Sequence, residues 1–273
     1  MTASRPCAEV IGDPVDHSLS PVIHGFWLEV MGIEAEYRRR RVGRGELAAY
    51  VEQRRSDGDW RGCNVTMPLK LDAITLADEA SDRAVGTGAA NILIPRNGKI
   101  LAGNSDVAAV MILAERLRHS GARFDLIHLL GSGGAARAAL MALHLLGQHQ
   151  VQILSRDRAE AIKLAVQFGL QQEPQPFDTP LSGDGLINAT PLGMAGSPPL
   201  HVELSSLKSS AWVIDFVTVP SPTPLIQQAA RLGLATVDGI AMLVEQAADS
   251  FRHFFDAEPP RDRDSELMER LGR

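Results

Sequence analysis

Short apolar runs rich in β-branched residues alternate along this chain with longer stretches in which apolar residues recur every three or four positions. Cys7–Ile11 is the first predicted strand, and the helical spacing of apolar residues after Ser20-Pro21 continues until Gly32. We expect Ser20 to be the N-cap of this helix, with Pro21 in its first turn. The alternation indicates an α/β protein with largely parallel sheets.

The second half of the chain repeats this alternation. Arg96-Asn97-Gly98 separates two β-rich runs, residues 90–95 and 99–102, and the Asn-Gly pair predicts a hairpin turn. A helix from about Asp106 to His119 is then expected to bridge two domains. The later predicted strands and the last amphipathic helix are, in order, Phe124–Leu130, Val151–Leu154, Gly185–Asn188, Trp212–Val217, Leu234–Val237 and Ile240–Phe255.

Length and charge narrow the classes of protein to consider. The 273 residues suffice for one large or two modest domains, and the net charge of −6 argues against a nucleic-acid or membrane binder. No signal peptide or membrane span is evident, so we expect a cytoplasmic protein.

Cys7 and Cys63 make no disulfide framework, and no Cys or His spacing predicts a metal site. Arg38–Arg41, the one dense basic run, indicates a solvated strand edge or loop, with a polyanion or partner contact as the alternative.

A glycine turn predicts dinucleotide binding. Gly131-x-Gly133-x-x-Ala136 directly follows an apolar strand and opens a helix, which is the context that this motif needs. The glycines permit a tight turn and close approach of the backbone to a pyrophosphate at the helix N-terminus. After the next strand, Arg156 favours the 2′-phosphate of NADP, whereas Asp157 would favour the ribose of NAD. We therefore expect NADP, with NAD as the alternative.

Four polar residues suggest a hydride-transfer site for a small hydroxylated acid. Lys70 alone would be read as solvated, Asp106 as a helix cap, and Ser18 and Ser20 as turn or cap residues. Together, a lysine can give or take the proton of a hydroxyl group while a carboxylate orients it. Two serine hydroxyls beside a helix N-terminus suit a substrate carboxylate.

These segments resemble the shikimate dehydrogenase family, which includes quinate dehydrogenases, over nearly the whole chain. The resemblance implies an N-terminal α/β substrate domain, residues 1–105, and a Rossmann-type NADP-binding domain with a doubly wound parallel sheet, residues 106–239. The helices of residues 240–273 would pack back on the first domain. The matching segments are Gly12–His24, Asn64–Lys70, Ala90-Asn91, Gly103–Asp106, Gly131–Ala138, Asn188–Met194, Pro220–Leu225 and Met242–Gln246.

The resemblance also implies residue roles and a reaction. Lys70 and Asp106 would be the catalytic pair, and Ser18 with Ser20 would hold the substrate carboxylate. The reaction implied is the reversible reduction of 3-dehydroshikimate by NADPH to shikimate, in aromatic amino-acid biosynthesis, by a monomer or homodimer. The substrate-hydroxyl contacts implied are Thr66, Asn91, Asp106 and Gln246. The cofactor contacts implied are Gly131, Ser132, Gly133, Gly134, Ala135, Ser155, Arg156, Asn188, Thr190, Met194, Val217 and Gly239.

Some positions depart from the family pattern. Ile92 and Ser105 stand where threonines are typical, Thr218 where a tyrosine is typical, and Ser155-Arg156-Asp157 where Asn-Arg-Thr is usual. Because lost polar partners change discrimination among substrates, quinate or a related hydroxy acid with NAD or NADP is the first alternative. A non-catalytic metabolite sensor is disfavoured by the Lys70/Asp106 pair. An unrelated substrate such as a folate is disfavoured by the serine cradle.

Overall fold

The computed structural model describes residues 5–273 and divides them into two compact units. The first unit runs up to Ser105 and includes Gln246–Arg273, and the second is Asp106–Glu245. The divisions therefore fall at the start of helix α5 (Ser105–His119) and inside helix α9 (Gly239–Phe255). Residues 1–4, on which the expectation of no signal peptide partly depends, lie outside the described part.

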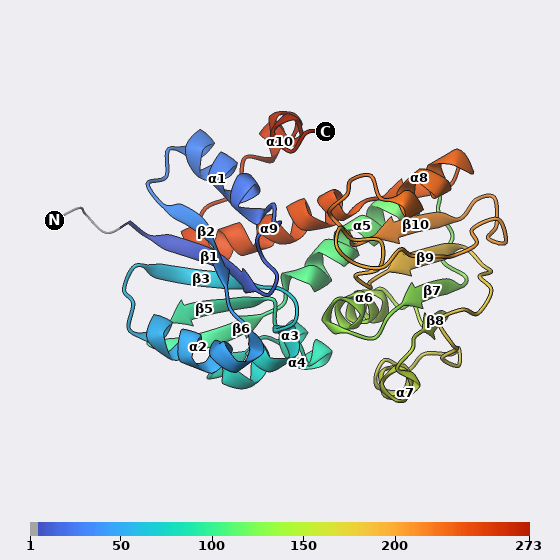
Figure 1. Cartoon of the computed structure of the whole chain (residues 1–273), viewed down its shortest axis with the longest axis horizontal. Helices are drawn as coiled ribbons and strands as arrows, with labels where there is room; N and C mark the ends of the chain where they lie inside the picture. The colour runs from blue at the N-terminus through green and yellow to red at the C-terminus, as the bar shows by residue number, and fades with distance from the viewer. Residues whose placement is uncertain (1–4) are drawn as a thin grey trace. The chain divides into compact units, whose positions relative to one another are not determined.

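The first unit is built on a six-stranded mixed sheet of order β2-β1-β3-β5-β6-β4 (Figure 1). Strands β2, β1 and β3 run parallel, whereas β5 is antiparallel to both β3 and β6. Asn97 and Gly98, with φ of 52° and 75°, join β5 to β6, which confirms the predicted hairpin turn. The strands are β1 Cys7–Gly12, β2 Glu36–Arg41, β3 Trp60–Val65, β4 Glu79–Ala80, β5 Ile92–Arg96 and β6 Lys99–Gly103.

Helices cover both faces of this sheet (Figure 1). Apolar residues of α2, α3 and α4 share one core with the sheet. On the other face, His24 and Trp27 of α1 meet Phe251 of α9, and the ion pair of Arg270 with Glu29 at 2.7 Å joins α10 to α1. The helices of this unit, besides α9, are α1 Ser20–Met31, α2 Leu47–Arg55, α3 Lys70–Ala73, α4 Asp82–Thr87 and α10 Asp264–Arg270, with short 3₁₀ helices at Arg44–Glu46, Ile74–Leu76 and Arg261–Arg263.

The start of α1 differs from the sequence expectation. Ser20 is the first residue of the helix, and Leu19 is its N-cap, without a side-chain cap. Leu19 already has a helical backbone conformation, and its carbonyl accepts from the N–H groups of Val22 and Ile23. The prediction of Ser20 as N-cap is therefore wrong. Instead, the backbone N–H of Ser20 donates to Ser18 Oγ at 3.3 Å.

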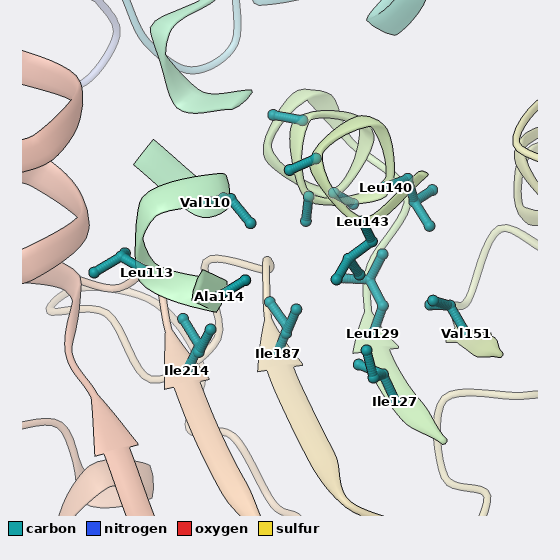
Figure 2. Close-up of a cluster of buried hydrophobic side chains, with 14 of the residues drawn as sticks. Val110, Leu113, Ala114, Ile127, Leu129, Leu140, Leu143, Val151, Ile187 and Ile214 are labelled. Carbon is teal, nitrogen blue, oxygen red and sulfur yellow. The ribbon is translucent and has the colours of Figure 1, made fainter. Parts of the chain in front are cut away.

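The second unit is a doubly wound Rossmann-type domain with a five-stranded, wholly parallel sheet of order β11-β10-β9-β7-β8. Strand side chains alternate between two cores: Leu129 and Ile187 face one core, and Leu130 and Leu186 face the other. Figure 2 shows Leu129 and Ile187 under side chains of α5 and α6. The strands are β7 Ile127–Leu130, β8 Val151–Leu154, β9 Gly185–Asn188, β10 Trp212–Asp215 and β11 Ala235–Val237. The helices, besides α5 and α9, are α6 Gly134–Leu145 and α7 Arg158–Gln167, which share the first core, and α8 Pro224–Arg231, which shares the second.

The described residues also bear on the expectations about membrane spans, metal sites and cysteines. No helix in residues 5–273 is long and apolar enough to cross a membrane. Within the same range, no group of three or more His, Cys, Asp or Glu residues is placed to hold a metal ion. Cys7 and Cys63 are free and buried, and burial raises the pKa of Cys63 to about 12. Cys63 is therefore a neutral thiol that packs in the core.

Candidate active site

The predicted substrate residues of the first unit gather at one end of its sheet. Parallel strands β1 and β3 end there side by side, and the antiparallel neighbour β5 begins there, opposite the end of β6. The loops at this end carry Ser18 and Ser20 after β1, and Thr66 and Lys70 after β3. Asn91 lies just before β5. The topology thus brings together residues that are up to 73 positions apart in the sequence, from Ser18 to Asn91.

Backbone hydrogen bonds fix the loop that carries Lys70. The N–H of Thr66 donates to the carbonyl of Ile11 at 2.9 Å, and the N–H of Leu69 donates to the carbonyl of Thr66 at 3.0 Å. Lys70 is half-buried and begins α3, and its carbonyl accepts from the N–H of Ala90 at 2.8 Å. These bonds use only backbone atoms, so they remain available when the lysine side chain is replaced.

An arginine lies beside the predicted carboxylate cradle. Ser18 is half-buried and Ser20 is buried. Arg39 donates to the carbonyl oxygen of Ser18 from Nε at 2.9 Å and from Nη2 at 2.6 Å. The basic run Arg38–Arg41 forms most of β2, an edge strand, which agrees with the strand-edge interpretation of the sequence. Arg39 therefore fixes the serine loop and adds positive charge close to it.

Asn91, Ser105 and Gln246 form a buried polar group. Asn91 Nδ2 donates to Ser105 Oγ at 2.9 Å, and the backbone N–H of Ser105 donates to Asn91 Oδ1 at 2.7 Å. Ser105 Oγ donates to Gln246 Oε1 at 3.4 Å. The two bonds to Ser105 fix which way the Asn91 amide points. Two residues predicted to contact substrate hydroxyls are thus held through one serine.

The two predicted catalytic residues belong to different units. Lys70 lies in the first unit. Asp106 is the second residue of α5, is 6% exposed and lies in the second unit. That Lys70 and Asp106 act together on one substrate therefore stays a prediction.

The glycine turn of the second unit has the shape that a dinucleotide needs. It follows β7 where the strand order reverses between β7 and β9, the usual ligand position in such sheets. Gly131 has φ of +103°, and a Cβ there would lie 3.0 Å from Thr190 Cγ2. A Cβ at Gly133 would meet nothing within 4 Å, and α6 begins at the next residue, Gly134. The first N–H groups of α6 have no partner within the helix, so the open side of this turn fits a pyrophosphate. The predicted contact Ala135 follows in the first turn of α6.

The residues after β8 include an arginine and an aspartate with different roles. Ser155 Oγ bonds Ser132 Oγ at 3.0 Å, which links the glycine turn to the next strand. Asp157 Oδ1 accepts from the N–H of Glu160 at 3.0 Å and is the N-cap of α7. Arg156 is exposed and makes no ion pair within the described residues. The carboxylate thus has a structural role, and the arginine is available for an anion.

A buried aspartate that sequence reasoning missed organises the ends of β9 and β10. Asp215, 1% exposed, accepts from Asn188 Nδ2 at 2.9 Å, Thr223 Oγ1 at 2.6 Å and the N–H of Val217 at 3.1 Å. Burial raises the pKa of Asp215, and these three hydrogen bonds oppose the shift. Asn188 Oδ1 in turn accepts from Thr190 Oγ1 at 2.7 Å. The sequence signal was present, because an Asp at a strand end lies opposite Asn188 of the parallel neighbour.

The remaining predicted cofactor residues lie on loops after these strands. A Cβ at Gly239 would lie 2.2 Å from the carbonyl oxygen of Val217, so the two backbones touch and a larger residue is excluded. Met194 is half-buried, and the N–H of the following Ala195 donates to the carbonyl of Val219 at 2.8 Å. Asn188 at the end of β9 and Gly239 at the start of α9 therefore lie in the same unit as Thr190, Met194 and Val217 of the connecting loops.

Comparison with known proteins agrees with this arrangement. Residues 10–93 match the family model "Shikimate dehydrogenase substrate binding domain", and residues 239–268 match "Shikimate 5'-dehydrogenase C-terminal domain". A shikimate dehydrogenase (NADP(+)) of Sphingopyxis alaskensis is 45% identical over 97% of this chain and 96% of its own length.

Solved structures match over the same extent. Shikimate 5-dehydrogenase from Thermus thermophilus, in complex with NADP(H) and shikimate, is 29% identical with a TM-score of 0.84 and covers 97% of this chain and 98% of its own. Quinate dehydrogenase from Corynebacterium glutamicum, in complex with NAD, is also 29% identical, with a TM-score of 0.82 over 97% and 98%. This chain therefore belongs to the shikimate dehydrogenase family.

Proposed function

We propose that this chain is an NADP-dependent shikimate dehydrogenase that interconverts 3-dehydroshikimate and shikimate. The observation that carries the proposal is the gathering of Ser18, Ser20, Thr66, Lys70 and Asn91 at one end of the first sheet. Hydroxyl, amide and ammonium groups there suit a carboxylate and several hydroxyl groups. The 45% identical relative, named a shikimate dehydrogenase (NADP(+)), supports the same substrate and cofactor. A cytoplasmic location and a monomeric or homodimeric state stay predictions.

Different residues would bind the carboxylate and the hydroxyl groups of the substrate. Ser18 and Ser20 would donate hydrogen bonds to the carboxylate, with the positive charge of Arg39 beside the loop. Thr66, Asn91 and Gln246 would contact the ring hydroxyls. Because a site built to hydrogen-bond a hydroxyl rejects analogues that lack it, these contacts would select the substrate.

Lys70 and Asp106 would manage the proton of the reacting hydroxyl. In the reductive direction, the Lys70 ammonium hydrogen-bonds the keto oxygen and supplies the proton as negative charge develops there. In the oxidative direction, Lys70 accepts that proton. Asp106 would orient the lysine and hold the substrate in place. NADPH, when bound, supplies the hydride.

The second unit would hold the cofactor. The glycine turn and the first turn of α6 fit the pyrophosphate, and Ser132, Gly134 and Ala135 lie on this segment. The loops with Asn188, Thr190, Met194 and Gly239, ordered by Asp215, would line the nicotinamide side.

Replacing Arg156 by alanine should weaken NADP selectively. The expected rise in the KM for NADP is roughly tenfold, because a charge-assisted bond to the 2′-phosphate is lost. The KM for NAD should stay within about twofold, since NAD has no such phosphate and Asp157 stays in its helix cap. Lys163→Ala, seven residues further along on α7, removes the same charge and is the control. Equal losses for both cofactors in Arg156→Ala would refute the phosphate contact.

A kinetic grid tests the proposed function. Shikimate and quinate are each assayed with NADP and with NAD by the absorbance of the reduced nicotinamide. The highest kcat/KM is expected for shikimate with NADP. Quinate with NAD is the second candidate, favoured by Thr218 and Ile92 and by the likeness to a quinate dehydrogenase structure in complex with NAD. Absence of turnover with shikimate would reject the proposal.

A further inference from the structure

A line of buried polar side chains runs through the first unit behind the predicted substrate residues. Tyr37 Oη donates to Asn64 Oδ1 at 2.6 Å, and Asn64 Nδ2 donates to Ser250 Oγ at 2.7 Å. Ser250 Oγ lies 3.3 Å from Ser105 Oγ, which contacts both Asn91 and Gln246. All four residues of the line, Tyr37, Asn64, Ser250 and Ser105, are at most 8% exposed.

Counting hydrogens fixes the direction of these bonds. Ser250 Oγ donates its one hydrogen to the carbonyl of Gln246 at 2.9 Å, so it accepts from Asn64 Nδ2, and the one hydrogen of Ser105 Oγ is shared between Ser250 Oγ at 3.3 Å and Gln246 Oε1 at 3.4 Å. Asn64 Oδ1 accepts from Tyr37, and its Nδ2 also reaches the carbonyl of Asn91 at 3.4 Å. The polar atoms of Asn64 thus hold other side chains, and Tyr37 keeps its proton because burial raises its pKa.

Tyr37 is itself held at the other end. Its ring stacks on His24, with ring centroids 3.9 Å apart and planes within 2° of parallel. His24 lies on α1, the helix that begins at Ser20. The line therefore runs from a ring packed on this helix to the residues predicted to contact substrate hydroxyls.

We propose that Tyr37 and Ser250 are positioning residues for substrate: through Asn64 and Ser105 they set the orientation of the Asn91 and Gln246 side chains. The inference rests on the proposed function, in which those two amides contact substrate hydroxyls. Tyr37 and Ser250 would act through these neighbours and not by direct contact with substrate or cofactor. Loss of the Tyr37 hydroxyl would leave Asn64 Oδ1 without its donor, and loss of the Ser250 hydroxyl would remove one partner each of Asn64 Nδ2 and Ser105 Oγ, so the amides could adopt other orientations.

The two tyrosines of the chain provide a matched test. Tyr37→Phe removes the hydroxyl that bonds Asn64, and Tyr50→Phe removes an equally buried hydroxyl of the same unit that bonds Glu9 at 2.7 Å, outside the line. Both variants should lose thermal stability. Only Tyr37→Phe should raise the KM for shikimate, by about tenfold, with the KM for NADP within about twofold of the wild type.

Ser250→Ala gives an independent measurement at the other end of the line. It should raise the KM for shikimate by a similar factor, and the double variant Tyr37→Phe/Ser250→Ala should show less than the product of the two effects, because both act through Asn64. Kinetics are measured at a temperature at which melting curves show every variant folded.

The outcomes separate this inference from the proposed function. A wild type that turns over shikimate, together with Tyr37→Phe and Ser250→Ala variants whose KM for shikimate matches that of Tyr50→Phe, would overturn the inference alone. A wild type without activity toward shikimate would overturn both. Equal rises in the KM values for shikimate and NADP would point to general loosening of the fold and would also overturn the positioning role.

Discussion

Turnover of shikimate should fall by about 100-fold or more when Lys70 is replaced by alanine, with little change in substrate affinity. The proposed role of the lysine is proton transfer at the reacting oxygen, which matters in the transition state and less in the bound ground state. The loop should keep its position, since backbone bonds to Ile11 and Ala90 hold it without the side chain. The measurement is steady-state kinetics with shikimate and NADP, combined with calorimetry of shikimate binding.

A second lysine of the first unit is the matched control for Lys70. Lys99 is exposed and pairs with Glu79 at 2.6 Å. It is the first residue of β6, at the opposite end of the strand from Gly103. Lys99→Ala removes the same charge and should leave turnover within about twofold, since exposed ion pairs contribute little. A Lys70→Ala variant with the rate of Lys99→Ala would remove Lys70 from the mechanism.

Acidification from pH 7 to pH 5 should cost the first unit about 2 kcal/mol of its free energy of unfolding through His24 alone. The ring of His24 is wholly buried, and neither ring nitrogen has a partner within the described residues. Burial lowers the pKa of His24 from its ordinary 6.5 to about 3. The neutral ring is therefore the folded form, and its contribution is complete above about pH 6.5 and is lost as the pH falls toward 3.

Replacement of His24 by phenylalanine should remove this pH dependence. Phenylalanine keeps a ring against Tyr37 and Phe251 but cannot take a proton. Urea unfolding at pH 7 and pH 5 measures the difference, and His253→Gln, which changes an exposed histidine of α9, is the control with the wild-type slope. Equal losses in wild type and His24→Phe between these pH values would contradict the assignment.

The sequence predicted the elements with strong local signals and missed those set by distant contacts. The Asn97-Gly98 turn and the strand–glycine–helix segment at Gly131 are local patterns, and both were confirmed. Helix α10 was expected from the family resemblance and not from a local pattern, because four of its seven residues are charged and Leu267 alone is buried. Strand β7 begins at Ile127 and not at Phe124, whose ring packs 4.7 Å from that of Trp212.

The same distinction applies to the candidate site. Motifs placed Lys70 at a helix start and the glycine turn between a strand and a helix, because such positions follow directly from the alternation of elements. Asn91 was expected inside the β-rich run 90–95, whereas it lies just before β5. The line of buried polar residues was not foreseen, since Asn64 and Ser250 meet across 186 positions of sequence. Ser250 is the one serine of α9, and no local pattern indicates that its hydroxyl binds Asn64.

The four arginines of β2 have a consequence for how copies of this protein meet. Arg38, Arg39 and Arg41 bond Glu36, the carbonyl of Ser18 and Asp13, and Arg40 lies 4.0 Å from Glu9. Their side chains line the outer strand, where unpaired backbone groups would otherwise accept another strand. Three of these arginines face carboxylates and Arg39 binds a neutral carbonyl, so the outer strand presents a row of charged side chains that a second strand would have to desolvate. This edge should therefore be a poor template for another strand, which disfavours fibrous aggregation at high concentration.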